Sequence, residues 1–283
     1  MRFLNIDRGI EIHHDGDLPA RSGMGSSSAF TVGLLHALYA LKGQMPSKRQ
    51  LMQDSIYVEQ ECLRETVGSQ DQVSAAYGGL NYINFMTSGE ISVRPLTLPS
   101  DRLHELNNHL MLFYTGIKRT ASDVADSYVN GIEDKKRQLR IIRDLVEESV
   151  AILSSGRDIT PFGELLHEAW QTKRSLSEKV SNSHVDALYE QAITAGALGG
   201  KLTGAGGGGF LLLFVPPSRQ SSVKSALKHL IHVPFRFEFS GSQIIFFEPE
   251  VDYQVEETER AQQSVQRFQE LNHLVEERVG RRE

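Results

Sequence analysis

Cysteine is nearly absent from this 283-residue sequence, and its scarcity excludes two kinds of site. Cys62 is the single cysteine, so neither an internal disulfide nor a metal site built from several cysteines can form. A chain without disulfides is suited to a reducing compartment. We therefore expect a cytoplasmic location.

Long apolar runs and an excess of positive charge are also missing. The longest apolar run covers residues 210–215, far short of the ~20 residues that span a bilayer, and the N-terminus lacks the pattern of a signal peptide. The net charge is −6, which argues against a nucleic-acid-binding protein with a broad basic surface. Hydrophobic residues make up 40% of the chain, enough for a sizeable core. We expect a globular protein that has neither a membrane nor a nucleic acid as its partner.

Apolar periodicity and turn residues predict an α+β protein. Residue 47 is a serine and residue 50 a glutamine, a spacing typical of a helix N-terminus. The order of elements after residue 106 predicts helices on one face of an antiparallel sheet. Predicted helices cover 29–42, 47–63, 121–154, 160–180, 186–197, 218–230 and 255–279. Predicted strands cover 110–114, 210–215, 234–239 and 243–247, and a hairpin is expected from residue 78 onward. The expected domains are 1–104, 105–250 and a helical tail, 251–283.

A glycine- and serine-rich loop, P-A-R-S-G-M-G-S-S-S, leads into the first of these helices. It contains Gly23, Gly25, Ser26 and Ser27. The N–H groups at a helix N-terminus are unpaired and carry partial positive charge, so they attract phosphate. Glycines let the backbone approach the anion, and serine hydroxyls can bind phosphate or Mg²⁺. The pattern alone fits an ordinary serine cap after a glycine turn equally well.

A second loop contains four consecutive glycines, at positions 206–209. Gly204, Gly206 and Gly209 match G-x-G-x-x-G, but that dinucleotide fingerprint follows a strand and opens a helix, whereas here a helix comes first and a strand follows. The H-R-D and D-F-G motifs of protein kinases do not occur. We expect this loop to lie against another loop or a ligand.

Two acidic residues are candidates for phosphoryl-transfer chemistry. Asp71 lies in G-S-Q-D-Q-V, and Glu59 precedes it by twelve residues on a predicted helix. Phosphoryl transfer uses a carboxylate to orient or deprotonate a hydroxyl, and oxygen ligands to hold Mg²⁺. Taken singly, either acid is more often a solvated surface charge.

These pieces together resemble the GHMP kinases, the family named for galactokinase, homoserine kinase, mevalonate kinase and phosphomevalonate kinase. P-A-R-S-G-M-G-S-S-S-A resembles the second family motif, P-x-x-x-G-L-G-S-S-A-A, and K-L-T-G-A-G-G-G-G-F resembles the third. G-S-Q-D-Q is similar to the segment that carries the catalytic aspartate in galactokinase-like members. The sequence around these motifs is most similar to the D-glycero-D-manno-heptose 7-phosphate kinases.

The resemblance implies a fold and an activity. The fold would be the two-domain α+β GHMP fold, with an N-terminal domain of ribosomal S5-like type, a ferredoxin-like C-terminal domain and the active site between them. The activity would be ATP-dependent phosphorylation of a sugar or sugar phosphate hydroxyl, at the anomeric position of D-glycero-D-manno-heptose 7-phosphate. The implied small-molecule partner is this sugar phosphate.

The resemblance also implies roles for individual residues. Asp71 would be the catalytic base or orienting carboxylate, and Mg²⁺ would be held by Ser27 and Glu59. ATP phosphates would be wrapped by Gly23, Gly25, Ser26 and Ser27 and braced by Gly204, Gly206, Gly207 and Gly208. From their charge alone, Lys118 and Arg119 are expected to reach a substrate phosphate.

One departure from the family pattern limits these expectations. The first family motif, with an arginine and a G-G-x-x-D run, has no counterpart here. We therefore expect an incomplete N-terminal domain with low stability. The alternative function is a catalytically inactive member that binds nucleotide or a partner protein.

Overall fold

The computed structural model describes residues 1–7, 9–19, 22–118, 124, 127, 131–249 and 254–263. Contacts group the chain into two units, Met1–Ile245 and Phe246–Glu283. The second unit contains helix α10 (Gln254–Gln262), while residues 264–279 of the predicted tail helix lie outside the described residues. The predicted division between residues 104 and 105 stays a prediction.

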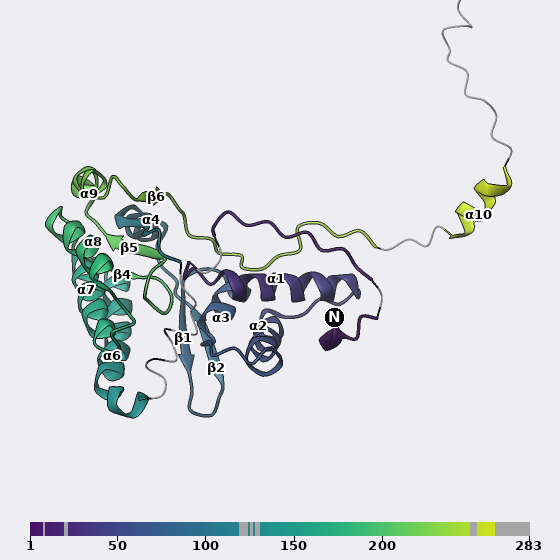
Figure 1. Cartoon of the computed structure of the whole chain (residues 1–283), viewed down its shortest axis with the longest axis horizontal. Coiled ribbons are helices and arrows are strands. Elements are labelled where there is room, and N and C mark those ends of the chain that lie inside the picture. The colour runs from purple at the N-terminus through teal and green to yellow at the C-terminus, as the bar shows by residue number, and fades with distance from the viewer. Residues whose placement is uncertain are drawn as a thin grey trace, which may run out of the picture. The chain divides into compact units, whose positions relative to one another are not determined.

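Three helices and a hairpin enclose the first part of the core (Figure 1). A short 3₁₀ turn, η1 (Arg2–Leu4), precedes them. The helices are α1 (Ser26–Leu41), α2 (Lys48–Tyr57) and α3 (Gln70–Tyr77), and α2 continues into a π-helical turn, η2 (Val58–Cys62). The hairpin consists of β1 (Asn81–Phe85) and β2 (Ile91–Pro95), paired antiparallel with Asn81 opposite Pro95. This confirms the predicted hairpin.

Helix α1 buries one apolar face and leaves other apolar residues exposed. Val32, Leu35 and Leu38 are its buried apolar residues, whereas Phe30 and Leu41 remain 40% and 41% exposed. The buried residues repeat every three positions, so they form one stripe that packs on α2 and α3. Helix α2 begins as predicted, because the Ser47 side chain accepts a hydrogen bond from the backbone N–H of Gln50 at 3.1 Å.

A four-stranded antiparallel sheet forms the second part of the fold. Its strands are β3 (Leu110–Tyr114), β4 (Gly199–Leu202), β5 (Phe210–Phe214) and β6 (Ile231–Val233), in the order β4-β5-β3-β6. The apolar runs of β3 and β5 pair with Leu110 opposite Phe214 and Leu112 opposite Leu212. These two strands confirm the predicted ones.

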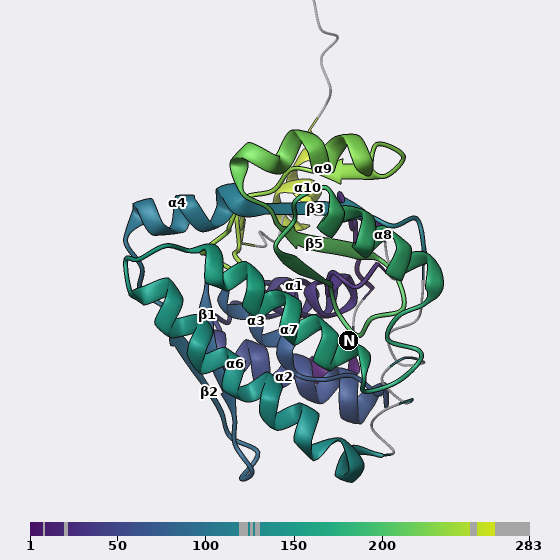
Figure 2. The ribbon, with the colours of Figure 1, turned by 90° about the vertical axis from the view of Figure 1, so that its left-hand side faces the viewer.

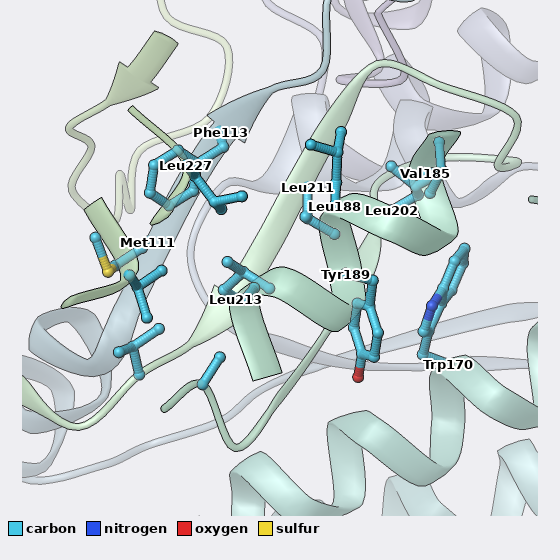
Figure 3. Close-up of a cluster of buried hydrophobic side chains, with 14 of the residues drawn as sticks. Met111, Phe113, Trp170, Val185, Leu188, Tyr189, Leu202, Leu211, Leu213 and Leu227 are labelled. Atoms are coloured by element: carbon cyan, nitrogen blue, oxygen red, sulfur yellow. The ribbon is translucent and has the colours of Figure 1, made fainter. Parts of the chain in front are cut away.

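Helices pack on both faces of this sheet, rather than on one as expected. Leu213 belongs to one buried cluster and its neighbour Phe214 to another, and successive side chains of a strand point to opposite faces. In the first cluster the rings of Trp170 and Tyr189 lie 6.2 Å apart beside the sheet (Figure 3). The second cluster joins Phe214 to Leu106 and to residues of two long helices.

The remaining helices surround the sheet. They are α4 (Ser100–His109), η3 (Ile132–Lys135), α6 (Lys136–Ser154), α7 (Thr160–Arg174), α8 (Ser183–Thr194), η4 (Pro217–Arg219) and α9 (Gln220–Ala226). Helices α6 and α7 run side by side (Figure 2), and α7 also lies along β4. A Cβ added to Gly199 would lie 2.0 Å from the carbonyl oxygen of Gly163, so this helix and strand are in direct backbone contact.

Several segments differ from the sequence prediction. Helix α4 occupies the expected boundary region, and β4 lies where a loop was expected. Residues 234–239 and 243–247 form no strand. The first of these segments bonds instead to the side chain of Asn107, which accepts from the N–H of Phe237 at 3.3 Å. No helix among the described residues combines the length and the apolar character needed to cross a bilayer.

The segment that follows β6 is hydrogen-bonded to the end of α3. The Gly79 N–H donates to the carbonyl of Glu238 at 2.7 Å, and the Ser242 N–H donates to the carbonyl of Ala75 at 2.9 Å. A Cβ added to Gly78 would lie 2.1 Å from the backbone nitrogen of Gly241. Only a residue without a side chain fits at this crossing.

We predict that Gly78→Ala destabilises the protein more than Gly43→Ala does. Both glycines have a left-handed backbone, with φ of +63° and +66°, but nothing lies within 4 Å of a Cβ at Gly43. The backbone strain costs about 1–2 kcal/mol at either position. The contact with Gly241 should add about 1–3 kcal/mol for Gly78→Ala alone. Equal melting temperatures of the two variants, measured by circular dichroism, would contradict the close backbone contact between Gly78 and Gly241.

Candidate functional site

The N-terminus of α1 is open to an anion. Gly25 precedes the helix with a φ of +67°, and no side chain caps the helix there. The first turn of α1 contains no acidic residue. By contrast, α2 and α8 are capped by the side chains of Ser47 and Asn182. The first N–H groups of a helix have no partner within it, so this end of α1 is built to receive a negative charge.

Asp71 lies directly against this helix end. It belongs to the first turn of α3. A Cβ added to Gly25 would lie 3.1 Å from Cγ and 3.2 Å from Oδ2 of Asp71. The left-handed backbone favours a glycine here, and a side chain at this position would also be tight against the carboxyl group. An anion held at the start of α1 would be a close neighbour of Asp71.

Glu59 is a buried carboxylate beside the same helix end. It lies in the π-helical turn η2, a type of distortion that is frequent at functional sites, and is only 1% exposed. Its Oε2 accepts hydrogen bonds from Ser28 Oγ at 3.0 Å and from Gln72 Nε2 at 2.5 Å. Among the described residues, its Oε1 has no hydrogen-bond partner, nor does Oε1 of Gln72.

The unpartnered oxygen of Glu59 fits a magnesium ligand. A buried carboxylate oxygen without a donor is costly unless an ion or water completes it. Mg²⁺ is usually held by one or two carboxylates together with substrate phosphates, and it keeps several waters. Among the described residues, no group of three or more His, Cys, Asp or Glu side chains could hold a metal by itself. The residues present therefore suit a cation that arrives with phosphate groups.

The second glycine loop reaches the first at Gly209. A Cβ added to Gly209, whose φ is +92°, would lie 1.9 Å from the carbonyl oxygen of Ser22. Ser22 itself is fully buried and donates from Oγ to the carbonyl of Pro19 at 2.7 Å. Two loops almost 190 positions apart are thus in backbone contact. This contact supports the expectation that the second loop lies against another loop.

The other glycines of this loop contact the elements around the sheet. Added Cβ atoms would lie 2.5 Å from the Val180 carbonyl at Gly206 and 2.6 Å from Ile117 Cγ2 at Gly208. Gly204 accepts a hydrogen bond from Lys173 Nζ at 2.5 Å, and Gly207 accepts one from Asn182 Nδ2 at 3.2 Å. These residues hold the loop in place, whereas Gly209 makes the contact with the first loop.

Several residues of the site were missed by sequence reasoning. They are Ser28, Gln72, Thr115 and Lys173. Thr115 is buried and holds the loop end, because its Oγ1 donates to the carbonyl of Gly209 at 2.7 Å. Ser28 and Gln72 stand next to predicted residues, so a search for polar neighbours one position away would have found them.

Some of the predicted site residues lie together around the start of α1, and others do not. Gly25, Asp71 and Glu59 lie around the start of α1, as the contacts above show. Ser27 is exposed, and the hydroxyl that bonds Glu59 belongs to its neighbour Ser28. Lys118 is exposed directly after Ile117, and Arg119 lies outside the described residues.

Comparison with known families matches two models to this chain. The model described as GHMP kinases N terminal domain matches residues 1–79. The model described as GHMP kinases C terminal matches residues 142–232. The predicted domain boundary falls in the segment between them.

Two curated kinases are similar over most of the chain. A D-glycero-alpha-D-manno-heptose 7-phosphate kinase of Campylobacter jejuni is 30% identical over 229 residues, which cover 80% of this chain and 67% of that protein. A mevalonate kinase of Pyrococcus horikoshii is 30% identical over 229 residues, covering 78% of this chain and 63% of that protein.

A solved structure agrees in fold. The D-glycero-D-manno-heptose 1-phosphate kinase of Bacteroides thetaiotaomicron superposes with a TM-score of 0.63 at 27% identity. The superposition covers 80% of this chain and 64% of that one. The chain thus spans about two thirds of the length of these relatives.

We predict that Gly209→Ala weakens ATP binding by about tenfold or more. Forcing Ser22 away would cost about 1–3 kcal/mol, and this cost would fall on the loop that we expect to bind the phosphates. Gly116→Ala is the matched control, since Gly116 has a φ of +79° and nothing lies within 4 Å of its Cβ position. Calorimetric titration with ATP measures both variants. If both variants bound ATP as tightly as the unmodified chain, the contact between the two loops would not contribute to ATP binding.

Proposed function

The chain belongs to the GHMP kinase family, and on that premise we propose that it transfers the γ-phosphoryl group of ATP to a hydroxyl of a sugar phosphate. The acceptor that we propose is the anomeric hydroxyl of D-glycero-D-manno-heptose 7-phosphate, in line with the name of the Campylobacter relative. The observation that carries the proposal is the contact of the Asp71 carboxyl group with Gly25, at the uncapped start of α1.

The binding of ATP would use backbone groups more than side chains. The start of α1 offers the N–H groups around Gly25, Ser26 and Ser27, and Gly23 lets the loop turn with a φ of +78°. The loop of Gly204, Gly206, Gly207 and Gly208 would brace this region from the other side, through the contact that Gly209 makes with Ser22. Preorganised dipoles of this kind stabilise the charge of a transferring phosphoryl group.

Asp71 would act on the acceptor hydroxyl. Its carboxyl group is half-buried and borders the proposed phosphate site. A carboxylate in this place can orient the hydroxyl toward the phosphorus atom and accept its proton as the new bond forms. The leaving group is ADP, and the proton passes from the hydroxyl to Asp71.

Glu59 and Ser27 would hold Mg²⁺ in this proposal. Oε1 of Glu59 supports it directly, because it is buried and lacks a donor. Ser27 stands in the first turn of α1 with its side chain exposed, so its hydroxyl is accessible. When bound, the cation neutralises charge on the phosphates.

The acceptor is the least constrained part of the proposal. The names of two relatives differ in the position of the phosphate, 7 in one and 1 in the other. Lys118 follows Ile117, which packs against Gly208, and we propose that its exposed ammonium group binds the phosphate of the acceptor. A cytoplasmic location stays part of the proposal, which the free and exposed thiol of Cys62 supports.

We predict that Asp71→Asn lowers kcat by about 10²–10⁴-fold, because the amide keeps the size of the side chain but cannot accept a proton. ATP affinity should change little. Asp101→Asn is the matched control, since Asp101 is exposed in the first turn of α4. ADP release with heptose 7-phosphate as the acceptor gives kcat, and calorimetry gives ATP affinity. Near-normal turnover by Asp71→Asn would remove this residue from the chemistry.

The same assay compares acceptors and tests the activity itself. We expect heptose 7-phosphate to give a higher kcat/KM than heptose 1-phosphate, galactose or mevalonate. An unmodified chain that binds ATP but phosphorylates none of the four would contradict the proposal. That result would favour the alternative of a nucleotide-binding protein without catalytic activity.

A further inference from the structure

We propose that Ser28 and Gln72 are positioning residues that hold the Glu59 carboxylate in the orientation that binds the divalent cation. The inference rests on the proposed function, because it concerns the cation that accompanies ATP. It assigns a role to two residues that touch neither the nucleotide nor the acceptor in our proposal.

The two donors share one oxygen of the carboxylate. Ser28 Oγ and Gln72 Nε2 both donate to Oε2 of Glu59, at 3.0 and 2.5 Å. An ionised carboxylate can accept on both oxygens. Here the two protein donors converge on one oxygen and leave the other, Oε1, unpartnered. The arrangement satisfies one half of the carboxylate and presents the other half to a ligand.

Burial makes this arrangement rigid. Ser28, Glu59 and Gln72 are 5%, 1% and 0% exposed, so water cannot easily replace a missing donor. A glutamate side chain has several rotatable bonds, and fixing them costs conformational entropy. Because the folded protein already fixes the Glu59 side chain, this cost does not reduce the affinity for the cation. Two hydrogen bonds from different helices, α1 and α3, define the plane of the carboxylate. Partners that orient a metal ligand in this way typically change metal affinity by about 10–100-fold.

Gln72 offers a second acceptor beside the carboxylate. Its amide nitrogen is used by Glu59, and its own Oε1 is buried without a partner. Mg²⁺ keeps several bound waters in protein sites, and such waters donate hydrogen bonds. The free amide oxygen is therefore suited to accept from a water on the cation. This explains why two neighbouring buried oxygens both lack donors.

The resemblance assigns no role to either residue, although Gln72 belongs to the G-S-Q-D-Q segment. In P-x-x-x-G-L-G-S-S-A-A, the position of Ser28 is an alanine, which has no hydroxyl to donate. Gln72 follows Asp71 directly, and successive helical residues point about 100° apart. The first turn of α3 thus directs Asp71 toward Gly25 and Gln72 toward Glu59.

The experiment measures how much Mg²⁺ strengthens the binding of a non-hydrolysable ATP analogue, AMP-PNP, to the full chain. Calorimetry gives the affinity with and without Mg²⁺, and the ratio reports the contribution of the protein's metal ligands without any turnover. We expect this ratio to fall about 10-fold or more in Ser28→Ala and in Gln72→Met. Metal-free affinity should stay unchanged. Ser28→Thr keeps the hydroxyl and should restore most of the ratio.

Ser55→Ala is the matched control. Ser55 is fully buried, and its Oγ donates to the carbonyl of Leu51 at 2.7 Å, so its loss removes a buried serine bond without touching Glu59. The inference is wrong if Ser28→Ala and Gln72→Met keep the ratio of the unmodified chain, or if Ser55→Ala lowers it equally. A ratio of one in the unmodified chain would remove the cation site and this inference together. Failure to phosphorylate a sugar, with the ratio behaving as expected, would contradict the proposed acceptor reaction alone.

Discussion

The buried carboxylate of Glu59 is the constraint on which the arrangement of the first three helices depends. Removing a carboxylate from water is expensive unless donors replace the lost hydration. The donors come from α1 and α3 and the acceptor from η2, so these three segments must meet at one point. The same meeting brings Asp71 against Gly25. The hydrogen bonds that the buried Glu59 carboxylate requires therefore also set the geometry of the candidate site.

Glycines let distant segments reach this point. Gly25 lies beside Asp71, Gly209 contacts Ser22, and Gly78 crosses Gly241, each with a positive φ. At Gly209 and Gly78 the neighbour is closer than a side chain would allow. Glycine carries a larger entropy cost on folding than any other residue. At each of these three positions, the glycine allows close contact between parts of the chain that are far apart in sequence.

Much of this could be predicted from the sequence, but not the details of contact. The apolar runs of β3 and β5 and the Ser47 cap are local signals, and the structure confirms them. Strand β4 was missed because its glycines, 199 and 200, look like part of a loop. The proximity of α7 explains Gly199, and the proximity of Leu212 in β5 explains Gly200. Residues 234–239 have the composition of a strand, yet a strand needs a neighbouring ladder and Asn107 supplies other partners. The motif indicated Ser27, whereas Ser28 faces Glu59, since one position on a helix turns the side chain by about 100°.

Comparison with relatives that are named for different acceptors distinguishes the groups that bind phosphate from the groups that select the acceptor. Kinases named for heptose phosphate and for mevalonate each match about four fifths of this chain at similar identity. What they share with it must then be the fold and the groups that serve any acceptor, and function differs by sites carried on a common fold. The start of α1, Asp71, Glu59 and the glycine loop fit that shared role, because each faces the proposed phosphate end of the reaction. Discrimination between acceptors requires side chains that reach the far end of the sugar, and the proposed role of Lys118, exposed after Ile117 at the edge of the glycine loop, belongs to this part of the reaction.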